Sequence, residues 1–526
     1  MPRSSSFKPL LFTTTLRNPE RLKYFIKILS NYENKKLTNQ LAIKIIQDCI
    51  KEKIYRPDKS FRLHPELKRI YNSDEAFTDI QAEKLIEASS QDHKEAGFDE
   101  GWASRFATAF GICKEFGFAW YQAPLIKEEI IKISNLGKKL IEEVAFNNIP
   151  EPWKDEIISD NEQLIFTHAL AKYQRNNPFR RVLNEVKPLS LLLRTIKLLN
   201  SDNEVSSAGI SKKEIPLLLF WKNNDAQQLY LKIKSIRKKF KPTPSDEIIL
   251  EICDELNAGK RFNSFQDKTI MNELPDEFIR KMRITGLLSL RGGGRFLDIN
   301  MNRMNLVEHV ISNHSNCEIF KSEEEYFKMM SHEDNFLLNY SSTIQEVASE
   351  GQLISWINKF GWETIKEELN ILAEKKSTQN EELKPIPGYV RLEFLTALAI
   401  KAKCQNTKVV PNYKSDDEGK PYFQAPGRRF DIECEENNKK YFIEVTLIDN
   451  SAQVERETNK IQRKINDYLN EKKMELLTHF VAPKIHADTI NYCDWLKDSK
   501  KIYVTSNKIV DFINKIETYN NLSNVN

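Results

Sequence analysis

Two acidic residues near the C-terminal end of this chain have the types and spacing that metal-dependent chemistry needs. Asp431 and Glu444 each stand in a short segment of alternating apolar and polar residues, and the polar residues 436–439 separate the two segments. This pattern predicts a β-hairpin. Because side chains alternate between the two faces of a strand, both carboxylates could project from one face. Like charges held that close together require a cation, and an all-oxygen site suits Mg²⁺.

The simpler interpretation is a surface hairpin whose acids face water, and the spacing taken alone favours it. The surrounding segments favour the more specific interpretation. Hydrophobic periodicity and capping residues predict an α/β domain with the order helix 389–403, strands 407–413, 429–435 and 440–448, helix 452–471, strand 478–484, helix 487–498, strand 501–505 and helix 507–517. A helix, a meander that carries Asp and Glu, and then a helix and further strands resemble the core of PD-(D/E)XK nucleases.

Length and composition indicate a soluble protein with several domains. The chain has 526 residues, too many for one hydrophobic core, and we expect about three or four domains. It contains no apolar run of roughly eighteen residues and no signal peptide, so we expect a cytoplasmic protein without a membrane span. The 7 cysteines form no CxxC pair and the 8 histidines form no HxxxH or HExxH pattern. We therefore expect no zinc site, and histidines that lie at the surface or cap helices.

Two segments of the N-terminal half have the same order of predicted elements. Residues 111–142 and 280–311 each predict the end of a helix, a strand, a turn, a second strand and a capped helix. A hairpin between helices is typical of the tail of a winged helix. The second copy also has a front end, with a capped apolar helix at 211–220 and a basic amphipathic helix at 226–240. A winged helix that binds protein instead of DNA is the alternative.

The predicted basic helix is a candidate for reading DNA. The net charge of +4 decides little, but basic residues gather on this helix. In a major groove, its basic side chains would contact phosphates and its polar ones would contact bases. The candidate DNA-binding residues are Gln227, Lys234, Arg237 and Lys238 on this helix and, should it face elsewhere, Arg17 and Arg21 near the N-terminus.

These patterns predict a multi-domain chain that mixes α+β and α/β parts. We expect two winged-helix-like DNA-recognition subdomains at residues 1–150 and 151–315, a helical linker at 316–382 and a nuclease domain at 383–526. The linker is expected because its residues are strongly charged and helical in pattern. Pro385, Pro387 and Gly388 then mark the entry to the last domain.

A set of motifs extends the comparison to a known family. The matching residues are Asp431, Glu444-Val445-Thr446, Gln453, Glu457 and Phe480-Val481-Ala482-Pro483, and Glu393 stands where the family has an upstream helical glutamate. This segment resembles the cleavage domain of AlwI-family type IIS restriction endonucleases, a group with PleI-type, MlyI-type and strand-specific nicking relatives. Residues 12–21 also resemble the opening of the family, so the resemblance covers nearly the whole chain.

The resemblance implies a catalytic site for Mg²⁺. Asp431 and Glu444 would bind the ion, and Glu393 would be a further acid on or near it. Glu457 would support the metal ligands or accept a proton. A helix acid that merely pairs with Lys460 is the alternative for Glu457.

One motif position departs from the wider superfamily. Thr446 stands where most PD-(D/E)XK enzymes have a lysine, although this family commonly has threonine there. That lysine steers or activates the attacking water. Lys460 and Lys464 on the following helix are the candidates for its role, and a solvated helix charge is the alternative for each.

The resemblance also implies a function and partners. It implies a type IIS restriction endonuclease that binds a short asymmetric sequence in double-stranded DNA and cleaves a few base pairs away. Cutting both strands implies a transient homodimer through the catalytic domain or a second cleavage subunit, and host protection implies a cognate DNA methyltransferase. A nicking subunit and a winged-helix regulator with an inactive C-terminal domain are the alternatives. The four acids argue against the inactive regulator.

Overall fold

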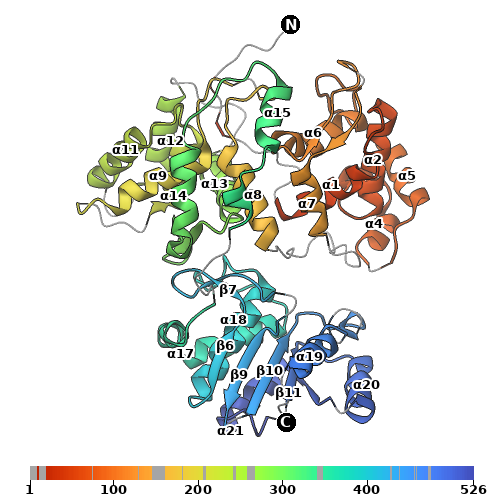
Figure 1. Ribbon diagram of the computed structural model, residues 1–526, viewed down its shortest axis with the longest axis vertical. Helices are drawn as coiled ribbons and strands as arrows, with labels where there is room; N and C mark the ends of the chain where they lie inside the picture. Colours follow the sequence, from red (N-terminus) through yellow and green to blue (C-terminus); the bar gives the residue numbers. More distant parts are fainter. Residues whose placement is uncertain are drawn as a thin grey trace. The chain divides into compact units, whose positions relative to one another are not determined.

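The structure is a computed structural model of the chain, a mixed α+β protein rich in helices (Figure 1). It describes residues 7, 9–10, 19–73, 75–127, 129–144, 160–180, 182–204, 209–240, 244–257, 267–340, 347–426, 429–437, 439–454, 457, 459–471, 476–500 and 502–525. The chain forms two compact units, which are an N-terminal unit (residues 1–291, 295–299 and 303–341) and a C-terminal unit (residues 292–294, 300–302 and 342–526). Within the described residues, no helix is long and apolar enough to cross a membrane.

The first half of the N-terminal unit consists of helices and one short hairpin. Its elements are α1 (Leu22–Ser30), α2 (Asn39–Lys51), α3 (Asp58–Leu63), α4 (Pro65–Tyr71), α5 (Asp79–Glu87), α6 (Trp102–Glu115), β1 (Ala119–Trp120), β2 (Lys132–Ile133) and α7 (Asn135–Glu142). Strands β1 and β2 pair antiparallel. Ser134 caps α7 by accepting a hydrogen bond from the backbone N–H of Gly137, as its residue type predicts. The helix, hairpin and helix expected at 111–142 are therefore present.

The second half of the N-terminal unit repeats this order around a small sheet. Its elements are α8 (Asp160–Lys172), α9 (Pro188–Asn200), β3 (Ile210–Ser211), α10 (Ile215–Leu219), α11 (Ala226–Lys239), α12 (Asp246–Leu256), α13 (Leu274–Arg283), β4 (Leu288–Arg291), β5 (Phe296–Ile299), α14 (Met304–Asn313), α15 (Glu323–Ser331) and α16 (Asn335–Leu338). Strand β5 lies between β3 and β4 and is antiparallel to both. The expected basic helix is α11, which Asp225 caps and which packs through Leu229, Ile233 and Ile236.

One hydrophobic core runs through the whole N-terminal unit. Its buried residues extend along the chain from Leu10 to Leu337 without a division near residue 150. The two expected subdomains at 1–150 and 151–315 therefore share a core among the described residues. Helices α15 and α16 join the same core through Tyr326, Met330 and Leu337.

The C-terminal unit is built around a mixed five-stranded sheet (Figure 1). Its elements are α17 (Glu350–Ala373), α18 (Gly388–Lys403), β6 (Lys408–Pro411), β7 (Lys414–Ser415), β8 (Pro421–Phe423), β9 (Ile432–Glu436), β10 (Lys439–Val445), α19 (Asn459–Glu471), β11 (Leu476–Ala482), α20 (Ala487–Trp495), β12 (Val504–Lys508) and α21 (Ile509–Tyr519). The strand order is β12-β11-β10-β9-β6, with β10 antiparallel to β9 and parallel to β11. Every predicted helix and strand of this domain is present, and the β7–β8 hairpin is an addition.

The central strand β10 faces a different helical layer on each side of the sheet. Tyr441 and Ile443 pack into the core formed with α17, α18 and α21. Phe442 packs into the smaller core formed with α19. Because side chains alternate along a strand, Glu444 lies on the α19 side with Phe442.

The segment predicted as a helical linker is not a separate body among the described residues. Helices α15 and α16 belong to the N-terminal unit, and α17 belongs to the C-terminal unit. The charge and helical pattern of the segment suggested a helical connector, but α17 also carries an apolar face. Leu353, Trp356, Leu369 and Leu372 on that face are buried in the core shared with α18. Gly361, at φ +73°, interrupts the helical backbone of α17.

Candidate active site

The strand register brings the two predicted carboxylates together. Strands β9 and β10 pair with Ile432 opposite Ile443. Continuing this antiparallel register by one residue places Asp431, just before β9, opposite Glu444 in β10. The charge of Asp431 acts directly on the carboxyl group of Glu444. Both side chains are buried, so the hairpin is not the solvated surface element of the simpler interpretation.

The backbone holds Asp431 in place from two sides. Its Oδ2 accepts a hydrogen bond of 2.7 Å from the backbone N–H of Val445. Its own carbonyl oxygen accepts one of 2.9 Å from the backbone N–H of Asn412, and the side chain of Asn412 donates to the carbonyl oxygen of Phe430 at 2.8 Å. These bonds fix the turn from which Asp431 projects. Neither Asn412 nor the Val445 N–H stands out in the sequence, because backbone donors leave no pattern of residue types.

Glu393 reaches the same region from helix α18. Its side chain is buried, and its Oε2 accepts a hydrogen bond of 2.9 Å from the backbone N–H of Ala425. The negative charges of Asp431 and Glu444 act on its carboxyl group. The structure therefore brings together the three acids that the sequence analysis assigned to the metal.

A lysine from helix α19 lies beside these three acids, Glu393, Asp431 and Glu444, which together form the carboxylate group of the C-terminal unit. Lys464 donates a hydrogen bond from Nζ to Oε1 of Glu444, and both side chains are almost fully buried. The Lys464 ammonium also lies 5.5 Å from the centre of the Phe430 ring. Of the two lysines considered for the missing motif position, Lys464 contacts the carboxylate pair.

Glu457 and Lys460 lie at the edge of this group. Lys460 Nζ is 3.7 Å from Oε2 of Glu457, and the Lys460 side chain is 40% exposed against 5% for Lys464. Asp431 and Lys464 also act electrostatically on the Glu457 carboxyl group. Glu457 is thus placed near the site, paired with the more exposed of the two lysines.

Burial sets the charge state of the carboxylates. Burial raises the pKa of Glu393 and Glu444 well above the usual glutamic acid range, and the charge of Asp431 raises both further. Burial also raises the pKa of Asp431, against the opposing effect of Lys464. Burial lowers the pKa of Lys464, but Glu444 and Asp431 outweigh it, so this pKa lies above the usual value. When ionised, these three carboxylates carry more negative charge than the single ammonium of Lys464 can neutralise.

This arrangement fits a hard divalent cation. The candidate ligands Asp431, Glu444 and Glu393 supply only oxygen atoms, which Mg²⁺ prefers. A bound cation would offset the cost of burying these carboxylates in their charged form, which is the main cause of their raised pKa values. One oxygen of Asp431 and one of Glu393 are held by backbone N–H groups, which orients the other oxygen of each carboxylate.

Two further motif residues have structural partners. Thr446 accepts a hydrogen bond of 3.2 Å from the backbone N–H of Ile448 through Oγ1, at the end of β10. Gln453 is fully buried and donates through Nε2 to the carbonyl oxygens of Ile448 and Lys484. Gln453 therefore joins the turn after β10 to the turn after β11, and the sequence motif marks a structural residue here.

The candidate DNA-binding residues of α11 lie in two different surroundings. Gln227 is exposed. Lys234 and Lys238 are close to acids that follow α9, with Lys234 Nζ 2.8 Å from Oδ2 of Asp202 and Lys238 Nζ 2.6 Å from Oε2 of Glu204. Phosphates would compete with these acids for the two lysines. DNA contact by these residues stays a prediction.

Arg237 differs from the expectation that it extends toward DNA. Its Nε and Nη2 donate to Oε1 and Oε2 of the buried Glu214 at 2.8 and 2.7 Å. Helical spacing grouped it with Lys238, but adjacent residues point about 100° apart on a helix. At the N-terminus, Arg21 donates from Nη2 to the carbonyl oxygen of Ile54 at 2.9 Å, and Arg17 lies outside the described residues.

Comparisons with known proteins identify a family. The model of the AlwI restriction endonuclease family matches residues 114–359 and 339–513. No curated protein matches the chain. The small subunit (R.BspD6I2) of the heterodimeric restriction endonuclease R.BspD6I is a similar solved structure, with 24% identity over 29% of this chain and 76% of that chain at a TM-score of 0.24.

The restriction endonuclease FokI is similar at 11% identity over 99% of this chain and 98% of that chain, with a TM-score of 0.26. FokI bound to DNA is similar at 11% identity over 98% and 96% of the two chains, with a TM-score of 0.22. The family match spans well over half of the chain and includes the carboxylate group on β9, β10 and α18. The protein therefore belongs to the AlwI restriction endonuclease family and is a site-specific nuclease.

Proposed function

We propose that the protein is a type IIS restriction endonuclease. Its N-terminal unit binds a short asymmetric sequence in double-stranded DNA, and its C-terminal unit hydrolyses phosphodiester bonds a few base pairs away with Mg²⁺. The observation that carries this proposal is the buried group of Asp431, Glu444 and Lys464, in which the acids and the lysine come from separate elements of one sheet-and-helix unit.

The order of elements in the C-terminal unit supports assignment to the PD-(D/E)XK nucleases. A helix with an acid (α18) precedes an antiparallel meander of β6, β9 and β10, and a helix (α19) leads into the parallel strand β11. In this arrangement Asp431 and Glu444 occupy the positions of the two motif acids. Thr446 occupies the position where the superfamily has a lysine.

The acids have distinct tasks in the proposed reaction. Asp431 and Glu444 would hold Mg²⁺, and Glu393 would lie on or near it. The bound ion would lower the pKa of a water molecule and offset charge on the scissile phosphate. The Val445 and Ala425 N–H groups keep Asp431 and Glu393 from rotating, which fixes the positions of the ligand oxygens before DNA arrives.

Lys464 takes over the role of the missing motif lysine in this proposal. Its ammonium is held protonated by Glu444 and Asp431, and it is the buried cation that contacts the carboxylate pair. When a phosphate enters, Lys464 fixes the orientation of Glu444 and supplies positive charge beside the reacting group. We regard Lys464 as a positioning residue because the atom that it contacts belongs to Glu444. Glu457 would accept or relay a proton at the edge of the site.

The N-terminal unit would read the DNA through its winged-helix-like parts. Two segments have a helix, a hairpin and a capped helix in sequence, and the second also has the basic helix α11. Gln227 at the exposed start of α11 is suited to contact a base edge. Lys234 and Lys238 would exchange Asp202 and Glu204 for phosphates. Should α11 face elsewhere, Arg21 near the N-terminus would be the candidate DNA contact.

One active site cuts one strand, so cleavage of both strands requires two active sites. The described part of the C-terminal unit contains one such site, formed by Glu393, Asp431 and Glu444. We propose a transient homodimer through the C-terminal unit or pairing with a second cleavage subunit. A cognate DNA methyltransferase would protect the host genome from cleavage.

Incubation of a supercoiled plasmid with the full-length protein tests this proposal. With Mg²⁺ we expect linear DNA, and sequencing of its ends should place the cuts at a constant distance from one asymmetric sequence. Open circles alone would indicate a nicking subunit. Supercoiled plasmid that is bound but never cut would indicate an inactive regulator.

The Asp431→Asn variant is the control for contaminating nucleases. It should bind the same site and leave the plasmid intact. Cutting by this variant at the same position would contradict the proposed site.

A further inference from the structure

Two histidines and an aspartate of the N-terminal unit converge away from the carboxylate group. The Nε2 atoms of His309 and His314 each lie 2.9 Å from Oδ2 of Asp334. These ligand-type atoms all lie within 4.8 Å of one another. His309 lies on α14, His314 directly follows α14, and Asp334 directly precedes α16. The sequence analysis missed this group because the spacing His-x₄-His matches neither HxxxH nor HExxH.

We propose that His309, His314 and Asp334 bind a zinc-type transition metal ion that joins α14 to α16. Two imidazole nitrogens and one carboxylate oxygen form a donor set that Zn²⁺ commonly takes, with a water in the fourth position. Ligand atoms around tetrahedral zinc lie roughly 3.4 Å apart, given bond lengths near 2.1 Å. The present contacts of 2.9 Å would need to open by only about half an ångström to admit the ion.

The surroundings hold the aspartate in a position suited to ligation. Its other oxygen, Oδ1, accepts hydrogen bonds from the backbone N–H groups of Phe336 and Leu337 at 3.0 and 3.3 Å. The carbonyl oxygen of His332, two residues earlier, is bound by His168 at 3.0 Å and by Lys172. The hydrogen bonds to Oδ1 direct Oδ2 of Asp334 to the histidines, as the outer contacts of metal ligands do.

The side chain next to His309 bears on the form of the imidazole that binds metal. A neutral imidazole is the form that ligates a metal ion. Ligation of His309 through Nε2 leaves its proton on Nδ1. The Nδ2 atom of Asn313 lies 3.3 Å from Nδ1 and donates to the carbonyl oxygen of His309 at 3.0 Å, so the amide must rotate for its oxygen to accept a hydrogen bond from Nδ1–H.

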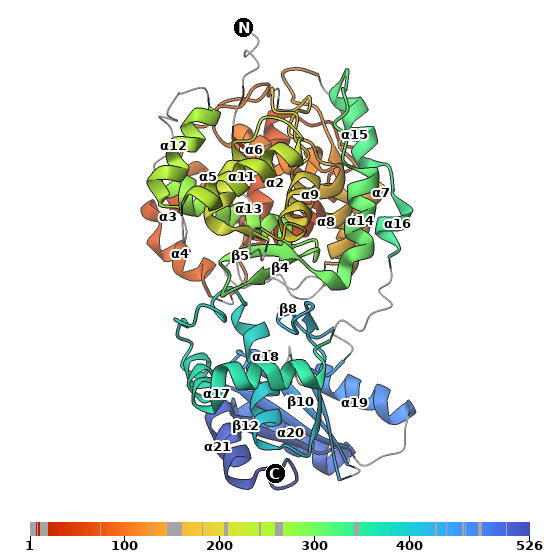
Figure 2. The ribbon, with the colours of Figure 1, turned by 90° about the vertical axis from the view of Figure 1, so that its left-hand side faces the viewer.

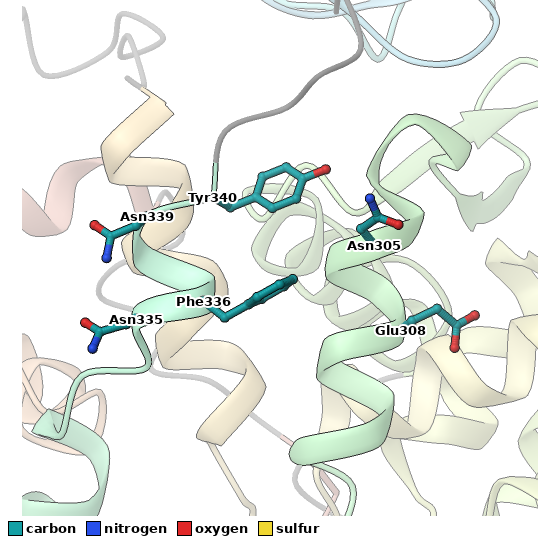
Figure 3. A pocket seen from close by; sticks show the side chains of 6 residues that line it. All are labelled: Asn305, Glu308, Asn335, Phe336, Asn339 and Tyr340. Atoms are coloured by element: carbon teal, nitrogen blue, oxygen red, sulfur yellow. The ribbon is translucent and has the colours of Figure 1, made fainter.

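A cavity lies next to Phe336, the residue whose ring packs on His309. It has a volume of about 610 Å³ and lies between α14, which contributes Asn305 and Glu308, and α16, which contributes Phe336, with Tyr340 just after α16 (Figure 3). The ring of Phe336 stacks on His309 with centroids 4.1 Å apart and planes at 11°. Figure 2 shows α14 and α16 as neighbours.

The ion would account for how a very short helix is held. Helix α16 has 4 residues, and an isolated helix of this length is unstable in water. Leu337 anchors it in the core, and the three proposed ligands join its N-terminal end to the end of α14. A metal bound in the folded state and absent from the unfolded state adds its binding free energy to stability.

The test measures zinc in the full-length protein. All samples carry Asp431→Asn and Glu444→Gln, so that the carboxylate group of the C-terminal unit contributes no metal. After chelator treatment and dialysis against ZnCl₂, elemental analysis should find one zinc per chain, and zinc should raise the thermal midpoint. His309→Gln and His314→Gln should each lose the zinc and the thermal shift, because glutamine keeps a side-chain N–H donor to Asp334 but is a poor zinc ligand.

His64→Gln is the matched control within the same unit. His64 also lies 3.0 Å from a carboxylate, Glu66, but has no second histidine beside it in the described structure. This variant should retain the zinc and the thermal shift. Equal zinc content in the parent and in both His309→Gln and His314→Gln would overturn the proposal, and so would a parent protein that retains none. The group would then be a hydrogen-bonded clamp without metal.

Discussion

Helices α11 and α19 are both basic and amphipathic, but their lysines have different partners. Lys464 of α19 pairs with Glu444 where both side chains are nearly inaccessible, at 5% and 6% exposure. Lys238 of α11 pairs with Glu204 where both are more than half exposed. In the first case water cannot screen the charges, so the pair changes the protonation of its surroundings. In the second case water screens the pair, and another anion such as a phosphate can replace the acid.

This difference separates a helix that completes a reaction site from a helix that is available for a charged partner. Removing a charge from α19 should alter chemistry, whereas removing one from α11 should alter affinity. The following predictions test the comparison from the largest expected effect to the smallest.

The largest effect is expected at the acids that Lys464 faces. Asp431→Asn or Glu444→Gln removes a proposed Mg²⁺ ligand, and loss of several kcal/mol of transition-state stabilisation corresponds to about 10³-fold or more in rate. Cleavage of a plasmid under single-turnover conditions measures this loss, and a gel-shift assay in Ca²⁺ should show nearly unchanged DNA affinity. Parallel losses of cleavage and affinity would mean that these acids organise DNA binding instead.

Lys464→Ala should reduce the cleavage rate by about 10²–10³-fold, the range for loss of one electrostatic stabiliser. Lys464→Arg should recover part of the rate, and its pH–rate profile should shift because Glu444 then has a different cationic neighbour. Lys460→Ala, one turn earlier on the same helix, should stay within a few-fold of the unchanged protein. If the two alanine variants are equally impaired, α19 supports the site by packing and not through one buried charge.

The clearest effect on specificity is expected at the exposed start of α11. Gln227→Ala should weaken binding to the cognate sequence by roughly 1–3 kcal/mol and relax preference at one base pair, as loss of a base contact does. Competition binding against every single-base variant of the site measures this. A uniform loss over all sequences would show that Gln227 contacts the DNA backbone.

Glu393→Gln should change how the stability of the metal-free protein depends on pH. Burial raises the folded-state pKa of Glu393, so the folded protein keeps a proton that the unfolded chain releases above its ordinary pKa near 4.3. Wild-type stability should therefore fall as pH rises above about 5, and the glutamine variant should lose part of this fall. Thermal unfolding in EDTA between about pH 5 and 8 measures the difference.

Glu382→Gln is the control of opposite sign. Its side chain pairs with Lys359 and Lys420, which hold the pKa of Glu382 below its usual value against the effect of burial. This variant should be less stable than wild type at neutral pH, and the difference should vanish as pH falls below the folded-state pKa. The same pH trend in both variants would contradict the assigned directions.

The smallest effect is expected for the exposed lysine of α11. Lys238→Ala should weaken cognate and noncognate binding alike and reduce the slope of log affinity against log salt by about one unit. Lys328→Ala on α15, where the lysine is also more than half exposed and pairs with an acid, is the matched control and should leave the slope unchanged. If both variants change it equally, the basic character of α11 is not special.

The sequence was most informative where residue type and local geometry act together. Alternation and polar breaks located β9 and β10, and the capped helices expected at the end of 111–142 and at 226–240 are α7, capped by Ser134, and α11, capped by Asp225. Strand periodicity predicted that Asp431 and Glu444 share a face, whereas Glu393 was assigned by the resemblance to the family. The charge of residues 316–382 was misleading, since an amphipathic helix such as α17 can be highly charged and still have one face in a core.

The sequence by itself determined the family, the order of elements in the C-terminal unit and the identity of its acidic residues. The tertiary structure decided which lysine faces the acids, that Arg237 is bound to Glu214, and that His309 and His314 meet Asp334. The physical reason is distance along the chain. Local patterns reflect backbone geometry over a few residues, whereas Lys464 and Glu444 are 20 residues apart and become neighbours only when α19 packs on the sheet.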